Sequence, residues 1–430
     1  MHTEELACGL RLVSETMPGV SSVSLGFWVG TGSRDEPAEM AGASHFLEHL
    51  LFKGTDERTA ASIAESLDEV GGDCNAFTTK EYTNFHIRLL AQDLPLGLDI
   101  LSDIMWQPAL SPHDVTAERM VILDEILMHS DEPADQAAER WNAALFPEHG
   151  LGRDTLGTAE SVKAIAAGDV RKFFEQHYRP GNIVVSVAGD CEHEVVARSL
   201  EDRFRGPSGG GAPTRRPPTA MPEPLTALER DTEQVHMVLG CRAPSRHDER
   251  RWAFALLNHV LGGGLSSRLF REVREERGLA YSIWSERVSY EETGLLCVMA
   301  GTSVEHFDEV LRITEGAVER LADHGVTDRE LQVAKSNIRA DMLLSVEDSG
   351  SRMSWLGSSL LLHGEVRSMA DLLARFEDVG PAEVQQSAAE LAESPRTLSV
   401  VGPVDPASID YGILGPWAGR AGSERTSVSR

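Results

Sequence analysis

Residues 22–37 read SVSLGFWVGTGSRDEP, and from 23 to 29 every second residue of this stretch is apolar. The alternating residues are Val23, Leu25, Phe27 and Val29. A period of two is typical of a strand with one buried face. A similar stretch, VHMVLGCRAPSRHDER, occupies residues 235–250 and places Gly240 214 positions after Gly26. The pattern therefore predicts a strand and suggests that the chain contains it twice.

Two further matches keep nearly the same separation. VVSVAGD resembles LSVVGPVD, with Gly189 and Gly402 213 positions apart, and Glu118 matches Glu330 at a separation of 212. Three matches in the same order at separations of 212–214 residues indicate a duplicated domain. Between the copies lies GPSGGGAPTRRPPTAMPEP, whose Gly and Pro content supports neither a helix nor a central strand. The predicted divisions are an N-terminal domain over 1–205, a linker over 206–224, a C-terminal domain over 225–417 and a disordered tail over 418–430.

Within the first copy, strand and helix patterns are interleaved. Helical spacing appears over residues 62–70, with Thr59 as N-cap and Gly71 as terminator, and a second strand signal lies in CNAFTTKEYTNFHIRLL. Further helices are predicted over 93–105, 112–130 and 161–176, and a strand in NIVVSVAGD. Short turns and alternating patterns favour an antiparallel sheet with helices on one face. The expected fold class is α+β, built twice.

Composition narrows the possible partners and location. The chain has 430 residues, of which 41% are apolar and 25% charged, as in globular proteins. A net charge of −28 argues against a nucleic-acid partner, because a phosphate backbone requires a basic face. No apolar run is long enough to cross a membrane. The five cysteines are scattered and never form CxxC, which predicts free thiols and a cytoplasmic location.

Residues 44–54, SHFLEHLLFKG, carry the polar residues with the clearest chemical pattern. On a helix, His45, Glu48 and His49 share one face. Ser44 is the expected N-cap and Gly54 the expected terminator. Two imidazoles one turn apart suit tetrahedral zinc, and H-x-x-E-H is a known order in zinc peptidases. The alternative is a core helix whose histidines bond to the backbone.

A catalytic zinc needs a third protein ligand. The helix predicted in SPHDVTAERMVILDEILMHSDEP carries Glu118 and Glu125 seven positions apart, on one face. Asp124 stands beside Glu125, and the pattern alone does not choose between these two carboxylates.

GASHFLEHLLFKGT followed by ERMVILDEI resembles the inverzincin zinc peptidases, the group of pitrilysin, insulin-degrading enzyme and the mitochondrial processing peptidases. The resemblance implies a processing-peptidase-like fold with one Zn²⁺ per chain. It implies His45, His49 and Glu125 as ligands, since Glu125 stands 76 residues after His49, about the separation that the family keeps. It also implies Glu48 as the base that activates water and Glu118 as a residue that supports the ligands.

Other segments extend this resemblance over nearly the whole chain. GGDCNAFTTKEYTNF resembles the family's substrate-binding edge strand, which implies substrate contacts from Asn75, Ala76 and Phe77. LFREVREERGLAYSIWS resembles the segment whose Arg and Tyr, here Arg274 and Tyr281, reach the substrate from the second domain.

The second copy lacks the metal motif. His259 stands 214 positions after His45, but Gly262 and Gly263 replace Glu48 and His49, and Asn337 replaces Glu125. The second copy is therefore expected to bind no metal.

These features predict a zinc endopeptidase that cuts peptides or unfolded segments in an enclosed chamber. Asp135 and Glu139, which follow the expected zinc helix, suggest basic, Arg-containing substrates. The resemblance implies a homodimer, or a heterodimer with a metal-less paralogue. Two alternatives stay open: a non-catalytic structural or assembly subunit, and a protease dedicated to maturing one small peptide.

Overall fold

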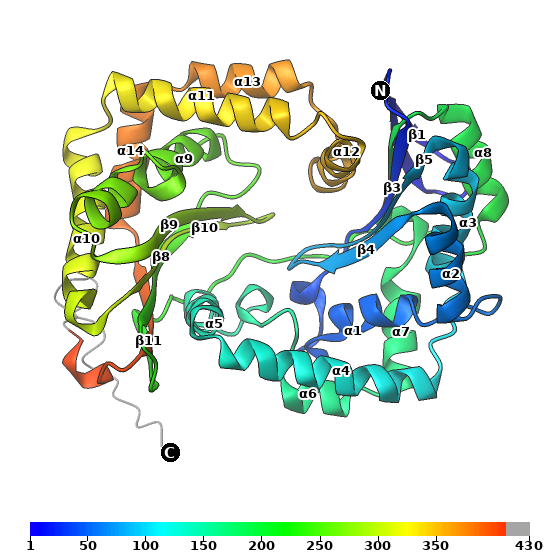
Figure 1. Cartoon of the computed structure of the whole chain (residues 1–430), viewed down its shortest axis with the longest axis horizontal. Coiled ribbons are helices and arrows are strands. Elements are labelled where there is room, and N and C mark those ends of the chain that lie inside the picture. Colours follow the sequence, from blue (N-terminus) through cyan, green and yellow to red (C-terminus); the bar gives the residue numbers. More distant parts are fainter. Residues whose placement is uncertain (410–430) are drawn as a thin grey trace. The chain divides into compact units, whose positions relative to one another are not determined.

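The computed structural model describes residues 1–409, which form two compact units, each built on one β-sheet (Figure 1). The first unit comprises Met1–Leu127, Arg153–Thr214 and Asp341–Ser368. The second comprises Met128–Gly152, Arg215–Ala340 and the described chain from Met369 onward. Among the described residues, no helix combines the length and apolar character that a membrane crossing requires. The tail predicted over 418–430 lies outside the described residues.

The sheet of the first unit has six strands in the order β1-β2-β6-β3-β5-β4. Strand β3 pairs antiparallel with β5 and β6, whereas β2 and β6 are parallel. The strands are β1 (His2–Glu5), β2 (Arg11–Thr16), β3 (Ser22–Val29), β4 (Asp73–Thr78), β5 (Thr83–Leu90) and β6 (Ile183–Gly189). The strand predicted at β3 is confirmed, but the expectation of one buried face was wrong, because Phe27 and Trp28 pack into different apolar clusters. Both faces of β3 are therefore buried.

Local sequence signals explain several helices of this unit. Helix α2 (Ala60–Val70) begins as predicted, because the Thr59 side chain accepts a hydrogen bond from the Ser62 N–H, and it ends at Gly71 in left-handed conformation. The other helices are α1 (Ala43–Leu51), α3 (Leu94–Trp106), α4 (Pro112–Asp131), α6 (Ala159–Ala164), α7 (Ala167–His177), α8 (His193–Arg203) and α12 (Ser349–His363).

The prediction of a single helix over residues 161–176 was wrong. It is divided into α6 and α7, because Ile165 adopts φ −59° and ψ 117°. The carbonyls of Val162 and Ile165 at this break accept hydrogen bonds from the Arg119 guanidinium on α4. A side chain from another element thus replaces the helical hydrogen bonds that are lost.

The expectation that helices cover only one face of the sheet was also wrong. Helix α12 packs on β3 and β6, and its Met353 and Leu356 lie in the same apolar cluster as Trp28. The guanidinium of Arg352 pairs with the Glu15 carboxylate, at 2.7–3.1 Å. This helix comes from far along the chain, so no local pattern revealed the face that it covers.

The second unit repeats this topology. Its strands lie in the order β7-β11-β8-β10-β9, and each matches a strand of the series β2-β6-β3-β5-β4, including one parallel pair, β7 with β11. They are β7 (Leu225–Glu229), β8 (Val235–Ala243), β9 (Ala280–Ser289), β10 (Gly294–Thr302) and β11 (Arg396–Gly402). The duplication read from the sequence is therefore confirmed, and each sheet is antiparallel except for one pair.

Helices of the second unit come from both sides of the linker. Helix α5 (Pro133–Leu145) packs on β8 and β11, and its Trp141 indole donates to the Thr397 carbonyl at 2.9 Å. The others are α9 (Arg251–Asn258), α10 (Phe307–His324), α11 (Asp328–Leu344), which runs across the division between the units, α13 (Met369–Asp378) and α14 (Pro381–Glu393). As predicted for the linker, no helix or strand lies between Arg203 and Leu225.

Candidate metal centre

Helix α1 carries the H-x-x-E-H residues, and its first turn is held by a buried carboxylate. The helix begins at Ala43 after Gly42, so the expectation that Ser44 is its N-cap was wrong. The Glu36 carboxylate accepts from the N–H of Gly42 at 2.8 Å and of Ser44 at 2.6 Å, which already satisfies the donors that a cap would serve. Gly54, expected to terminate the helix, lies beyond its end at Leu51.

This start of α1 leaves little freedom. Gly42 has φ 94°, and a Cβ there would lie 2.5 Å from the Leu156 carbonyl oxygen. Burial raises the pKa of the Glu36 carboxyl to about 7, and its two N–H donors and the Arg153 guanidinium act in the opposite direction. Buried contacts on both sides therefore fix where the helix starts.

Three potential ligand atoms converge beside α1. The Nε2 atoms of His45 and His49 are 3.3 Å apart, and Oε2 of Glu125, from α4, lies 3.6 and 3.7 Å from them. Ligand atoms about 2.0–2.1 Å from a tetrahedral zinc are separated by about 3.3–3.4 Å. Within residues 1–409 these three form the one such group of His, Cys, Asp or Glu side chains. The donor set and its spacing fit zinc.

Glu118 lies behind this group. It is buried on α4, and its Oε2 is 3.1 Å from Nδ1 of His49. With the proton on Nδ1, His49 donates a hydrogen bond to this carboxylate. Nε2 of His49 is then unprotonated, and its lone pair faces Glu125. The other oxygen of Glu118 pairs with Lys53 Nζ at 2.8 Å. Lys53 was not anticipated from the sequence.

Glu48 is held by the sheet. The hydroxyl of Thr78, the last residue of β4, donates to Glu48 Oε2 at 2.5 Å. Burial raises the pKa of Glu48, and the Thr78 hydrogen bond and His49 lower it. The carboxylate is thereby fixed in one orientation on the side of α1 that carries the histidines.

Among the described strands, β4 is an edge of its sheet and pairs only with β5. Asn75 and Phe77 are exposed and Ala76 is half-buried between them. The Phe77 ring packs edge-on against Trp28, with ring centroids 6.1 Å apart. The three predicted substrate-binding residues thus lie on the strand whose last residue contacts Glu48.

The remaining predicted site residues belong to the second unit. The Arg274 guanidinium lies 4.8 Å from the ring centroid of Tyr281, a side chain that is 79% exposed. Asp135 and Glu139 lie on α5, with Asp135 Oδ2 3.4 Å from Nδ1 of His129. The place of these four residues relative to the ligand group stays a prediction.

Comparison with known proteins gives the family. The profile of insulinase (peptidase family M16) matches residues 11–159, and that of the peptidase M16 inactive domain matches residues 164–338. A protein of Mycobacterium tuberculosis named an uncharacterized zinc protease is 43% identical over 400 residues, which cover 92% of this chain and 91% of the relative. One of Bacillus subtilis with the same description is 35% identical over 92% of this chain and 96% of its own.

Solved structures agree on the fold. A protease from Helicobacter pylori superimposes with a TM-score of 0.86 at 22% identity, covering 94% of this chain and 99% of that one. A peptidase M16 inactive domain from Pseudomonas fluorescens gives 0.87 at 20% identity, over 94% and 98%. With its two tandem domains and its zinc-protease relatives, the chain belongs to peptidase family M16, the insulinase family.

Proposed function

We propose that this chain is a zinc metalloendopeptidase of the H-x-x-E-H type. The observation that carries the proposal is the convergence of His45, His49 and Glu125 at 3.3–3.7 Å beside Glu48. Relatives named zinc proteases over nearly the full length support the same activity.

In the proposed site, His45, His49 and Glu125 hold one Zn²⁺ per chain. Zinc bound in this way supplies Lewis acidity, which polarises a carbonyl oxygen and makes a water molecule more acidic. Glu118 orients His49 through Nδ1, as a carboxylate behind a ligating histidine commonly does.

Glu48 serves as the proton carrier. Its carboxylate accepts a proton from the attacking water and delivers it to the amine that leaves when the peptide bond breaks. The Thr78 hydroxyl occupies Oε2 and holds the carboxylate plane, so Oε1 is the atom that takes the proton.

The substrate is proposed to bind as an added strand. Along Asn75, Ala76 and Phe77, every second residue of β4 points its backbone groups to the free edge, where an extended peptide can pair with them. The Ala76 N–H donates to Asn75 Oδ1 at 2.8 Å, a contact that a bound peptide would replace. A substrate bound in this way is recognised mainly through its backbone rather than its side chains, which suits peptides and unfolded segments. Arg274 and Tyr281, stacked in the second unit, are proposed to bind the substrate carbonyl or its developing negative charge.

Further features of the proposal rest on charge and cysteine chemistry. Asp135 and Glu139 favour basic, Arg-containing substrates, in keeping with the net charge of −28. All five cysteines are free, which supports a reducing, cytoplasmic setting. We propose that the chain works as a homodimer around an enclosed chamber, or else with a metal-less paralogue.

The decisive experiment replaces Glu48 by Gln in the purified chain. Cleavage of an Arg-containing peptide library should fall roughly 100-fold to 10,000-fold, while zinc content stays at that of the wild type. The matched control is Glu65→Gln, an exposed carboxylate on α2, which should leave cleavage unchanged. A chelator should stop the wild-type enzyme. Wild-type cleavage rates in Glu48→Gln would refute the assignment.

A further inference from the structure

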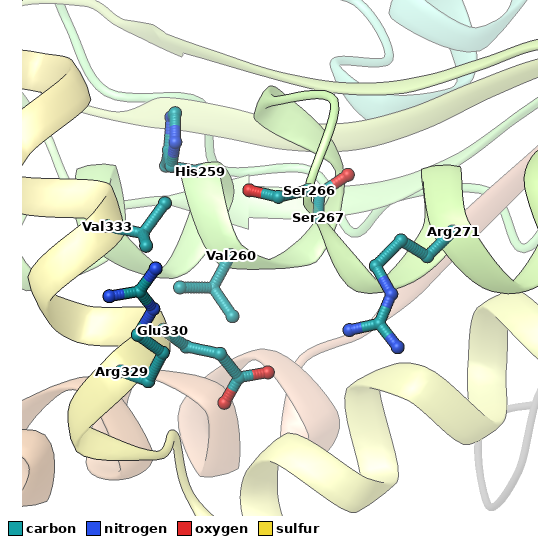
Figure 2. A pocket seen from close by; sticks show the side chains of 8 residues that line it. All are labelled: His259, Val260, Ser266, Ser267, Arg271, Arg329, Glu330 and Val333. Carbon is teal, nitrogen blue, oxygen red and sulfur yellow. The ribbon is translucent and has the colours of Figure 1, made fainter.

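The second unit contains a cavity of about 220 Å³ at the positions that match the metal centre in the sequence repeat (Figure 2). His259, which matches His45, and Glu330, which matches Glu118, both line it. The cavity lies between α11 and the π-helical turns His259–Gly263 and Phe270–Glu276, with Ser266 and Ser267 between those turns. Duplication has thus left a cavity in the copy that lost the metal motif.

The backbone prevents this cavity from being a weakened metal site. Gly262 stands where the first copy has Glu48, and a Cβ on it would lie 2.7 Å from the Ser285 backbone nitrogen of β9. A carboxylate therefore cannot be placed there without moving the strand. Asn337 in place of Glu125 removes the third ligand as well.

The two arginines that line the cavity are only partly neutralised by carboxylates. Arg271 and Arg329 extend from opposite sides of it (Figure 2). Arg329 makes no ion pair with any residue that the structure describes, and Arg271 has one exposed contact, to Glu276 Oε1 at 3.3 Å. Two guanidinium groups are therefore available to an anion.

Glu330, the acid in the wall, does not neutralise these groups. It accepts two hydrogen bonds from Arg268, at 2.8 and 3.0 Å, and one from the Thr327 N–H at 2.8 Å. The Arg268 guanidinium lowers the pKa of Glu330 to about 2. Glu330 is therefore ionised at neutral pH, and its negative charge is paired with Arg268.

A buried hydroxyl in the cavity wall is a further donor that a ligand can use. Ser267 is only 3% exposed, and its Oγ forms no hydrogen bond with any residue within 1–409. A buried polar group without a partner costs about 1–3 kcal/mol. An acceptor bound in the cavity would remove that cost. Val260 and Val333 supply apolar surface for the rest of such a ligand.

We propose that this cavity binds a small molecule through an oxyanion, either a carboxylate or a phosphate. Arg271 and Arg329 provide paired N–H donors that match the geometry of an oxyanion, and Ser267 Oγ donates a further hydrogen bond. In a chain of net charge −28, such a locally positive cavity selects anions that the rest of the molecule repels. The proposal does not depend on peptidase activity.

Isothermal titration calorimetry on the purified full chain tests it. The probes are inorganic phosphate, the dipeptide Ala-Val with its free carboxylate, and Ala-Val amide, which lacks the charge. We expect phosphate or Ala-Val to bind with a Kd below about 1 mM and the amide to give no signal. Binding of phosphate alone would identify a phosphate ligand, and binding of Ala-Val alone a carboxylate ligand.

Variants locate the binding. Arg329→Ala and Arg271→Ala should each weaken binding at least about tenfold, and Val333→Glu should abolish it. Arg320→Ala, whose guanidinium already pairs with Glu272 at 2.6 Å, is the matched control and should bind like the wild type.

Any of three outcomes would overturn the proposal. One is that neither phosphate nor Ala-Val binds the wild type. The other two are equal binding by the amide and equal binding by Arg329→Ala and Arg271→Ala. The His49→Ala variant separates this site from the proposed peptidase centre, because it should lose zinc and still bind the anion.

Discussion

Asp124 and Glu125 offer two neighbouring carboxylates on α4, and their surroundings differ. Glu125 Oε2 lies 3.6 and 3.7 Å from the two histidine Nε2 atoms, whereas Asp124 is exposed. Glu125→Gln removes the charge of the proposed third ligand, so we expect zinc content to fall by more than half after dialysis and cleavage to fall with it. Zinc is measured by atomic emission on the dialysed protein.

Asp124→Asn is the matched control for this change, since it removes the same charge one position earlier. It should keep zinc and activity at wild-type levels. Full zinc occupancy in Glu125→Gln, or its loss in Asp124→Asn, would assign the third ligand to another carboxylate.

Thr78 tests whether the sheet positions Glu48. Thr78→Val keeps the shape and the strand preference but removes the 2.5 Å hydrogen bond to Oε2. A hydrogen bond to a charged group contributes about 1.5–3 kcal/mol, so kcat should fall roughly 10-fold to 100-fold. KM and zinc content should change little, because the Thr78 hydroxyl bonds to Glu48 and not to a proposed ligand, and the substitution keeps the β4 backbone.

The control for Thr78→Val is Thr79→Val, which removes the hydrogen bond from Oγ1 to the Tyr82 carbonyl in the neighbouring turn. A loss of kcat as large in Thr79→Val would mean that the hairpin, not the Glu48 contact, causes the effect.

Residue spacing along single helices indicated the candidate ligands in the sequence, and the family resemblance chose Glu125 over Asp124. His45 and His49 share a face of α1, and Glu118 and Glu125 share a face of α4. Lys53, Thr78 and Glu36 could not be assigned roles in this way. Their contacts join residues that are far apart in sequence or depend on the fold, and no periodicity encodes them.

At the scale of the elements, the ion pair between Glu330 on α11 and Arg268 predicts that the stability of the fold depends on pH. The folded-state pKa of Glu330 is about 2, below its value of about 4.3 in an unfolded chain. The pair therefore stabilises the fold fully above about pH 4.3, and this contribution is lost as the pH falls toward 2. After allowance for solvent screening, Glu330→Gln should cost about 0.5–1 kcal/mol at pH 7.

Urea unfolding at pH 7, 4 and 3 measures this effect as the difference between wild type and Glu330→Gln, which should shrink at pH 3. Glu319→Gln, an exposed position on α10, should show no difference at any of the three pH values. If the difference in unfolding free energy between Glu330→Gln and wild type grew as the pH falls, it would contradict the sign of the pKa shift.

Element boundaries were predictable where capping residues define them. Helix α2 begins at Thr59 and ends at Gly71 through contacts local to the sequence. The break between α6 and α7 was missed, because residues 161–176 contain no Pro and the break is supported by Arg119 from another helix. The Ser44 cap was misread for a similar reason, since Glu36 fills that role.

At the scale of the whole molecule, each half of the chain completes the other's sheet. Helix α12, from beyond the linker, covers β3 and β6, and α5, from before it, covers β8 and β11. Trp28 and Leu356 are at most 1% exposed because of the first exchange, and Trp141 and Val401 because of the second. The proposed domain limits 1–205 and 225–417 do not describe these exchanges, which no sequence periodicity reveals.

This exchange predicts how the protein behaves when the linker is cut. A site for a specific protease inserted after Gly210 lies in an exposed segment without helix or strand. After complete cleavage, the two fragments should still elute from a sizing column as one species, because separation would expose the apolar surfaces under α12 and α5.

Leu356→Asp buries a charge against Trp28 and should lower the free energy of unfolding by about 3 kcal/mol or more. The cut variant should then separate or aggregate at urea concentrations that leave the cut wild type intact. Separation of the cut wild-type fragments in native buffer would show that α12 and α5 do not hold the halves together.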